Sequence, residues 1–268
     1  MKLVLRIITG IILLFTIGLT SYLGSYYFNS IIIITSCLCL YEILSIKKLN
    51  TSKIITTLSL TSIIILCIST TYIPTALFWK SPVVIITAIA LILLQCYELK
   101  QKNLLLINYK IPSTIFSILQ IGLSLPFAIL IRQLPNGLYL TLLFISLCVL
   151  SDIAAYFTGK AIGKTPLNSV SPKKTWEGTI AGLLFSLLTC LILIKVTLLP
   201  FNLIYICIII AILCPLGDLY ESLNKRAFNT KDSSTLLPGH GGFYDRLDSY
   251  IFGLPIFYYG ILLLERLS

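Results

Sequence analysis

The sequence predicts an all-α, polytopic integral membrane protein with about nine transmembrane helices and a cytoplasmic N-terminus. The chain has 268 residues, of which 57% are hydrophobic and only 11% are charged, whereas a soluble domain carries roughly 25% charged residues. The few charges are separated by long apolar windows. These observations exclude a soluble enzyme, a secreted disulfide scaffold and a disordered regulator, because too little polar surface is present to cover the chain in water.

The first four spans follow from the charge-free windows in the N-terminal part. A bilayer core about 30 Å thick requires roughly 20 apolar residues per helix. The window between Arg6 and Glu42 is too long for one helix, and Gly24 and Asn29 lie where it breaks. No small-residue cleavage site follows the first helix, so we expect an uncleaved anchor. The four spans are predicted near 3–22 and 28–46, between Lys53 and Lys80, and between Lys80 and Glu98.

Five further spans follow from the windows in the rest of the chain, with boundaries uncertain by a few residues. The eighth span starts at Pro200 and ends near Pro215-Leu216-Gly217. The other four lie between Lys110 and Arg132, Arg132 and Asp152, Glu177 and Lys195, and Asp248 and Glu265.

The distribution of Lys and Arg predicts the orientation. Nine spans with the N-terminus inside leave four of the 20 basic residues outside, namely Lys80, Arg132, Lys195 and Arg266. The remaining sixteen lie on the inner side, as the positive-inside rule requires. The net charge of +10 is therefore an orientation signal, and no nucleic-acid partner is expected. The eight cysteines lie in apolar stretches without a CxxC pair, so we expect neither a disulfide framework nor a zinc site.

Acidic residues separate two parts of one continuous membrane domain. Residues 1–150 contain only Glu42 and Glu98, whereas residues 151–250 contain seven acids. Acidic residues cost free energy inside the hydrocarbon and contribute little to orientation. We therefore interpret 1–150 as transmembrane scaffold and 151–268 as the catalytic region, with its polar loops on the cytoplasmic face.

The long polar stretch from Gly217 to Ser249 carries the main candidate site. Asp218, Asp245 and Asp248 supply hard oxygen ligands of the kind that Mg²⁺ prefers. Four cations suit phosphate groups: Lys225, Arg226, Lys231 and Arg246. Glycines allow close approach of the backbone to a ligand, and Gly239, Gly241 and Gly242 lie in the same stretch. Together these groups indicate metal-assisted phosphoryl or nucleotidyl transfer.

A second polar stretch runs from Asp152 to Gly178. Lys173 and Lys174 precede a helix that opens near Gly178, where an anionic group is favoured. Three readings stay open at this point: these lysines can be orientation signals, Asp152 can cap a span, and His240 can be a turn residue rather than a substrate contact.

These residues resemble the integral-membrane phosphatidate cytidylyltransferases, also called CDP-diglyceride synthases. The family signature over 27 positions is matched at the following residues: Ser222, Lys225-Arg226, Lys231-Asp232, Ser234, Leu237-Pro238, His240-Gly241-Gly242 and Asp245-Arg246-Leu247-Asp248. Two further blocks agree, Asp152-x-x-Ala155-Tyr156-Phe157-x-Gly159 and Ser171-Pro172-Lys173-Lys174-Thr175-Trp176-Glu177-Gly178. The likeness covers about residues 150–250 and departs from the pattern at Asn224, which replaces a large apolar residue.

The resemblance implies the reaction CTP + phosphatidate → CDP-diacylglycerol + pyrophosphate, which serves phospholipid synthesis. It implies a polytopic helical fold, Mg²⁺ with room for a second, monovalent or divalent cation, and a homodimer. From the short single-module chain without a targeting extension we expect a bacterial-type inner membrane, with the active site facing the cytoplasm. Metal binding carries over to Asp218 and Asp245, and we add Asp248 and Asp152. Catalytic roles fall to Asp218, Asp245, Lys225 and Arg246. Substrate contacts fall to Lys173, Lys174, Ser222, Arg226, Lys231, His240, Gly241 and Gly242.

Two other functions compete with this interpretation. A CTP-dependent polyprenol kinase would transfer the γ-phosphate and release CDP, but the intact spacing from Ser222 through His240 to Asp248 favours cytidylyl transfer. A transporter would place polar groups near the bilayer centre, whereas the acids of this chain gather in the predicted inner loops.

Overall fold

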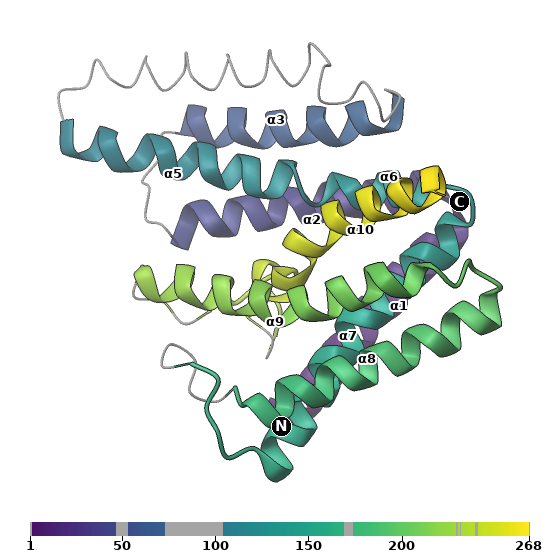
Figure 1. Cartoon of the computed structure of the whole chain (residues 1–268). Coiled ribbons are helices and arrows are strands. Elements are labelled where there is room, and N and C mark those ends of the chain that lie inside the picture. The colour runs from purple at the N-terminus through teal and green to yellow at the C-terminus, as the bar shows by residue number, and fades with distance from the viewer. Residues whose placement is uncertain are drawn as a thin grey trace. The chain divides into compact units, whose positions relative to one another are not determined.

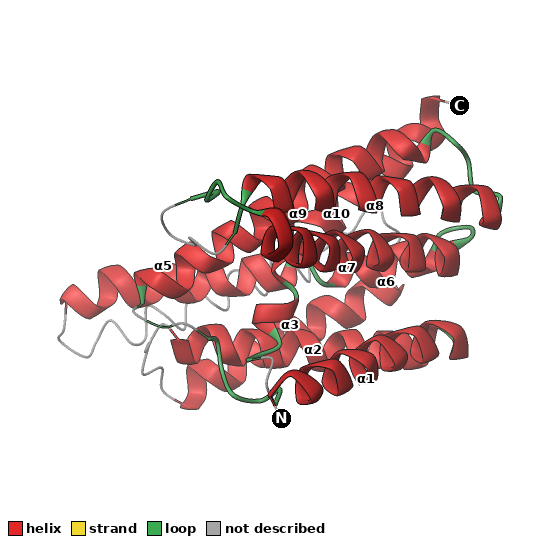
Figure 2. Ribbon diagram, turned by 90° about the horizontal axis from the view of Figure 1, so that it is seen from below, coloured by secondary structure: helices red, strands yellow, loops and turns green. Residues whose placement is uncertain are grey.

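The regular secondary structure of the protein is helical in the part of the chain that the structure describes. The computed structural model describes residues 2–46, 53–72, 104–168, 174–228, 230, 232–238 and 241–267. Within these ranges the regular elements are helices and no strand is present (Figures 1 and 2), which confirms the predicted all-α class. The chain forms two compact units, Met1–Leu130 with Asp232–Asp245, and Ile131–Lys231 with Arg246–Ser268.

The first unit is built around its second helix. It contains α1 (Lys2–Leu23), α2 (Ser25–Ile46), α3 (Lys53–Tyr72) and α5 (Leu104–Gly122). The predicted break between the first two helices occurs at Gly24, whose φ of 119° favours glycine. Helix α2 packs against α1, α3 and α5. Its buried side chains include Cys39, Leu40, Glu42, Ile43 and Leu44, so one carboxylate lies among apolar neighbours.

The second unit is a bundle of four helices: α7 (Gly137–Ile162), α8 (Trp176–Thr197), α9 (Leu203–Ala227) and α10 (Asp248–Leu267). Helix α7 packs along α8, and α9 packs along α10 (Figure 1). Phe144 of α7 is buried, and its ring centroid lies 5.2 Å from that of Phe257 and 5.5 Å from that of Tyr250. Edge-on and tilted aromatic pairs of this kind add to the free energy gained by burial. They fix α10 on α7 beside the polar end of the bundle.

Six stretches in the described part of the chain are long and apolar enough to cross a membrane. They are Ser25–Ile46, Ser113–Gln133, Gly137–Ile162, Trp176–Thr197, Leu203–Arg226 and Asp248–Leu267. Shorter apolar helices cover Ile8–Leu23 and Thr56–Thr71. The protein is therefore a polytopic membrane protein. The predicted span between Lys80 and Glu98 lies outside the described residues, and nine spans with an inner N-terminus remain predictions.

The fifth predicted span is divided in the structure. Helix α5 ends at Gly122, and α6 (Pro126–Gln133) begins after an interval of three residues. Proline is favoured at the first position of a helix, where its missing N–H removes no helical hydrogen bond. The window without charge therefore contains a break that charge spacing alone does not reveal.

Two helices extend further than their predicted spans. Helix α7 continues ten residues beyond Asp152 to Ile162, and α9 continues past Pro215 to Ala227. Each predicted span ended at the first charge, but a helix needs no apolar residue once its own backbone is hydrogen-bonded. As a consequence Asp152, Asp218 and Lys225 lie on helices, where we had expected loops. Asp152, Asp218 and Asp248 also lie within candidate spans, so a position in loops no longer separates an enzyme from a transporter.

Candidate active site

Three carboxyl groups meet in the second unit, each from a different helix. Asp152 comes from α7, Asp218 from α9, and Asp248 is the first residue of α10. The side chains of Asp218 and Asp248 are hydrogen-bonded, and Asp152 lies within electrostatic reach of both. Asp248 is buried, and Ser249 fixes this end of α10 by donating a 3.1 Å hydrogen bond from its hydroxyl to the Cys214 carbonyl of α9. Three acids gathered in this way repel one another unless a cation is near.

Lys174 supplies a cation to this cluster. Its ammonium forms an ion pair with the Asp218 carboxylate. Two backbone hydrogen bonds hold the connection between α7 and α8 on both sides of this lysine, from Leu167 N to Lys174 O at 2.7 Å and from Trp176 N to Thr165 O at 3.0 Å. The hydroxyl of Thr175 accepts a 3.2 Å hydrogen bond from Gly178 N and so caps α8. The cap and the loop together direct Lys174 to the acids.

The end of α9 presents the basic residues of the signature. Lys225 pairs with Glu221 one turn earlier at 2.7 Å, and both side chains are largely buried. Arg226 is exposed and Ser222 is half-buried on the same helix. Arg246, just ahead of α10, is exposed and lies within electrostatic reach of Asp152. The second unit thus brings together Asp152, Asp218, Asp248, Lys174 and Arg246, and presents Ser222, Lys225 and Arg226 on the last two turns of α9.

Asp245 belongs to the first unit, where its carboxylate binds the backbone of its own segment. Its Oδ2 accepts hydrogen bonds of 2.9 Å from Ser233 N and from Gly242 N, and its Oδ1 accepts one of 3.2 Å from Ser233 N. Gly241 has a φ of +86°, which L side chains rarely adopt. A side chain at Gly241 would also meet the Asp245 carboxylate. This predicted glycine is therefore required by the turn that Asp245 closes.

Glu42 is a site residue that the sequence argument missed. It lies on α2, in the part interpreted as scaffold, and its carboxylate accepts hydrogen bonds from the side chains of Ser233 and Ser234 and from the backbone of Phe243 and Tyr244. Its one signal in the sequence was a single acid in a long apolar window. Lys173, Lys231 and His240 lie outside the described residues, and their predicted roles remain predictions.

The donor set of the acid cluster fits a magnesium ion that is shared with substrate. In the part of the chain that the structure describes, no three His, Cys, Asp or Glu side chains are arranged as a complete metal site. Mg²⁺ usually takes one or two carboxylates and completes its octahedron with water and phosphate oxygens. Asp218 and Asp248 provide two carboxyl groups of the required kind in one place. The residues therefore suit an ion that arrives with a nucleotide better than a resident structural ion.

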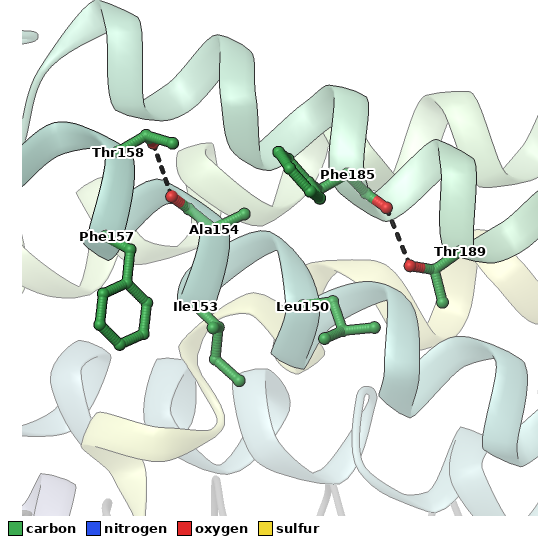
Figure 3. A pocket seen from close by; sticks show the side chains of 7 residues that line it. All are labelled: Leu150, Ile153, Ala154, Phe157, Thr158, Phe185 and Thr189. Atoms are coloured by element: carbon green, nitrogen blue, oxygen red, sulfur yellow. Dashed lines mark hydrogen bonds between the residues drawn. The ribbon is translucent and has the colours of Figure 1, made fainter. Parts of the chain in front are cut away.

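An apolar hollow of about 250 Å³ lies between α7 and α8. Figure 3 shows its lining, with Ile153 and Phe157 on α7 and Phe185 on α8. The threonines of the lining satisfy their hydroxyls within their own helices, from Thr158 to Ala154 O at 2.6 Å and from Thr189 to Phe185 O at 2.9 Å (Figure 3). The hollow therefore presents a hydrocarbon surface, and Ile153 in its lining is the next residue after Asp152.

Comparison with known proteins agrees with this chemistry. The Cytidylyltransferase family matches residues 4–264. A phosphatidate cytidylyltransferase of Bacillus subtilis (strain 168) is 31% identical over 262 residues, which cover 95% of this chain and 96% of that protein. One of Synechocystis sp. (strain ATCC 27184 / PCC 6803 / Kazusa) is 42% identical over 136 residues, or 50% of this chain and 46% of that protein. Phosphatidate cytidylyltransferase 4, chloroplastic, of Arabidopsis thaliana is 45% identical over 120 residues, and the match spans 30% of that longer protein. The chain belongs to the cytidylyltransferase family.

Proposed function

We propose that this protein is a phosphatidate cytidylyltransferase, a nucleotidyltransferase that converts CTP and phosphatidate into CDP-diacylglycerol and pyrophosphate. The observation that carries the proposal is the family match over residues 4–264 together with the full-length relative of the same activity. A phosphatidate oxygen attacks the α-phosphorus of CTP, and the bond to pyrophosphate breaks. The lipid phosphate is already mostly ionised near neutral pH, so the reaction needs no dedicated general base.

The acid cluster and the basic side chains have different proposed roles, metal binding for the acids and phosphate binding for the basic residues. Asp218 and Asp245 would hold Mg²⁺, with Asp248 and Asp152 beside it, and a second cation is compatible with four acids. A bound divalent ion would neutralise phosphate charge and offset the repulsion between the two anionic substrates. The assignment of Asp245 rests on the signature, because Asp245 and the cluster belong to different units.

The basic residues would bind the phosphates of both substrates. Lys174 lies at the acid cluster, and Arg246 is near it. We assign Lys225, Arg226 and Arg246 to the triphosphate and lipid phosphate, with Lys173 and Lys231 in the same role. Positive charge at the phosphates stabilises the charge that develops as pyrophosphate leaves. Ser222, His240, Gly241 and Gly242 complete the proposed substrate contacts.

The apolar hollow gives the lipid substrate a place beside this chemistry. Its lining is hydrocarbon and includes Leu150 and Ile153, which lie on either side of Asp152 in the sequence. An acyl chain lying between α7 and α8 would remain in the bilayer while its head group reaches the acids. The sixteen-to-four distribution of basic residues supports a site on the cytoplasmic face. A bacterial-type inner membrane is supported by the relative in Bacillus subtilis, and a homodimer is proposed from the family alone.

Release of pyrophosphate tests the proposal in purified protein. In detergent with Mg²⁺, pyrophosphate should form only when CTP and phosphatidate are both present. Asp245→Asn keeps the acceptor geometry of one oxygen but removes the charge, and should abolish release. Release of inorganic phosphate or CDP in place of pyrophosphate would contradict cytidylyl transfer.

A further inference from the structure

We propose that Glu42 is a positioning residue, which holds the segment formed by residues 233–238 and 241–245 in the conformation that presents Asp245. The metal-binding role of Asp245 comes from the proposed function, so the inference deepens that function. The interaction joins α2, in the N-terminal half of the chain, to the signature motif. All the residues concerned belong to the first unit.

The buried surroundings of Glu42 make a carboxylate without compensating interactions unfavourable. The residue is 1% exposed and lies on Ser25–Ile46, a candidate membrane span. Leu40, Ile43 and Leu44 beside it are buried too. A charged group in such a place costs free energy unless hydrogen bonds or an opposite charge compensate it. Acidic residues at such depth therefore mark function or a specific structural bond.

Four hydrogen bonds from the signature segment satisfy the Glu42 carboxylate. Oε1 accepts from the Ser234 hydroxyl at 2.6 Å and from Phe243 N at 3.0 Å. Oε2 accepts from the Ser233 hydroxyl at 3.0 Å and from Tyr244 N at 2.8 Å. Each oxygen thus binds one hydroxyl from the start of the segment and one N–H from its end. One side chain of α2 ties the two ends of the segment together.

The chemistry of the four donors requires a carboxylate. An ionised carboxylate has acceptors only, whereas an amide carries an NH₂ that cannot accept. In Glu42→Gln that NH₂ would face Phe243 N or Tyr244 N and leave a buried N–H without its acceptor. Gly242 explains how close the carboxylate comes, because a side chain there would collide with Glu42 and Ser233. The close contact between α2 and the segment therefore requires both Glu42 and the absence of a side chain at Gly242.

The same segment carries Asp245, so the hydrogen bonds of Glu42 also affect the position of Asp245. Asp245 Oδ2 accepts from Ser233 N and Gly242 N, and Glu42 binds Ser233 and the two residues after Gly242. Tyr244 is further held by a 3.1 Å hydrogen bond between its hydroxyl and Gln120 Nε2 on α5. A shift of the segment away from α2 would move Asp245 with it. Side chains that orient a metal ligand typically change metal affinity or activity by about 10–100-fold when they are replaced.

Hydrogen–deuterium exchange of metal-free protein reports on the segment without any reaction. In Glu42→Gln we expect peptides covering 232–245 to exchange at least about tenfold faster than in the wild type, which a lost hydrogen-bond acceptor predicts. The Mg²⁺ concentration for half-maximal turnover should rise by about 10–100-fold. Ile43→Ala is the matched control, since it removes buried packing from the same turn of α2 but leaves the four hydrogen bonds in place. It should change exchange along α2 and leave the Mg²⁺ dependence unaltered.

A second variant keeps the inference testable if Glu42→Gln does not fold. Ser233→Ala with Ser234→Ala removes two of the four donors and leaves the carboxylate, so the same changes should appear with smaller size. Unchanged exchange of 232–245 in the variant that folds would overturn the inference, as would an equal Mg²⁺ shift in Ile43→Ala. A different outcome is that the wild type makes no CDP-diacylglycerol while Glu42→Gln still exchanges faster over 232–245. That outcome would refute the proposed function and retain Glu42 as the anchor of the segment.

Discussion

Replacing Lys225 by methionine separates two roles that its contact with Glu221 combines. The signature assigns Lys225 to phosphate binding, but in the structure its ammonium lies 2.7 Å from the Glu221 carboxylate. The two side chains are only 14% and 4% exposed, so water screens the pair weakly. Removing one partner of a buried pair costs about 3–5 kcal/mol, because the other charge is left without compensation.

The size of that loss decides how the variant must be measured. At roughly 2–4 °C per kcal/mol for a chain of this size, Lys225→Met should lower the unfolding temperature by roughly 6–20 °C. Loss of a phosphate-binding cation should in addition lower kcat by about 10²–10³. Turnover must therefore be expressed per folded protein, at a temperature below the transition of the variant.

The double variant Glu221→Gln with Lys225→Met distinguishes the two roles. It removes both charges, and a buried pair replaced as a whole often costs little, so most of the lost stability should return. Activity should remain low if Lys225 binds phosphate. Thermal unfolding in detergent micelles and turnover of the two variants, with Glu221→Gln as control, give the answer. Recovery of activity together with stability would refute the catalytic role, and an unchanged unfolding temperature in Lys225→Met would refute the ion pair.

Three further predictions follow from the site and the hollow. Lys174→Met leaves the acid cluster without its paired cation, so the free energy of unfolding of the metal-free protein should fall by about 1–3 kcal/mol. Mg²⁺ should then raise the unfolding temperature of the variant more than that of the wild type. Equal Mg²⁺ shifts in thermal unfolding would contradict an ion at Asp218. Chelation by EDTA should abolish turnover reversibly while far-ultraviolet circular dichroism stays constant, since the ion arrives with substrate; helix loss on chelation would indicate a structural metal instead. Ala154→Trp fills the hollow between α7 and α8, and should raise KM several-fold for long-chain phosphatidate but not for a short-chain analogue; Ala154→Val is the milder control, and equal effects on both lipids would argue against acyl-chain binding there.

Composition and charge spacing were sufficient for the fold class. Apolar windows identified the helices because a bilayer requires long apolar segments whose backbone groups bond internally. The break at Gly24 was predicted correctly for the same reason. The end of α9 was placed too early, because the predicted span ended at the first charge, whereas the helix continues to Ala227. Residues from Asp218 to Arg226 therefore occupy a helix whose turns set their spacing.

Residue types in the signature were sufficient for the chemistry but not for all of the site. The acids and cations could be chosen because metal and phosphate each demand a particular ligand. Glu42 could not be chosen, since a lone acid 191 positions before Ser233 shows no spacing pattern. Lys225 illustrates the opposite case, where the motif named the residue and only the structure revealed its partner Glu221.

Cytidylyl transfer moves the CMP moiety of CTP to phosphatidate. The most direct measurement uses two parallel incubations of purified protein with phosphatidate and Mg²⁺, one with CTP labelled at the α-phosphate and one with CTP labelled at the γ-phosphate. The account predicts α-label in a chloroform-soluble lipid and γ-label in aqueous pyrophosphate, with both lost in Asp245→Asn. Label from the γ-phosphate in the lipid, with the α-label left in aqueous CDP, would contradict it and identify a lipid kinase.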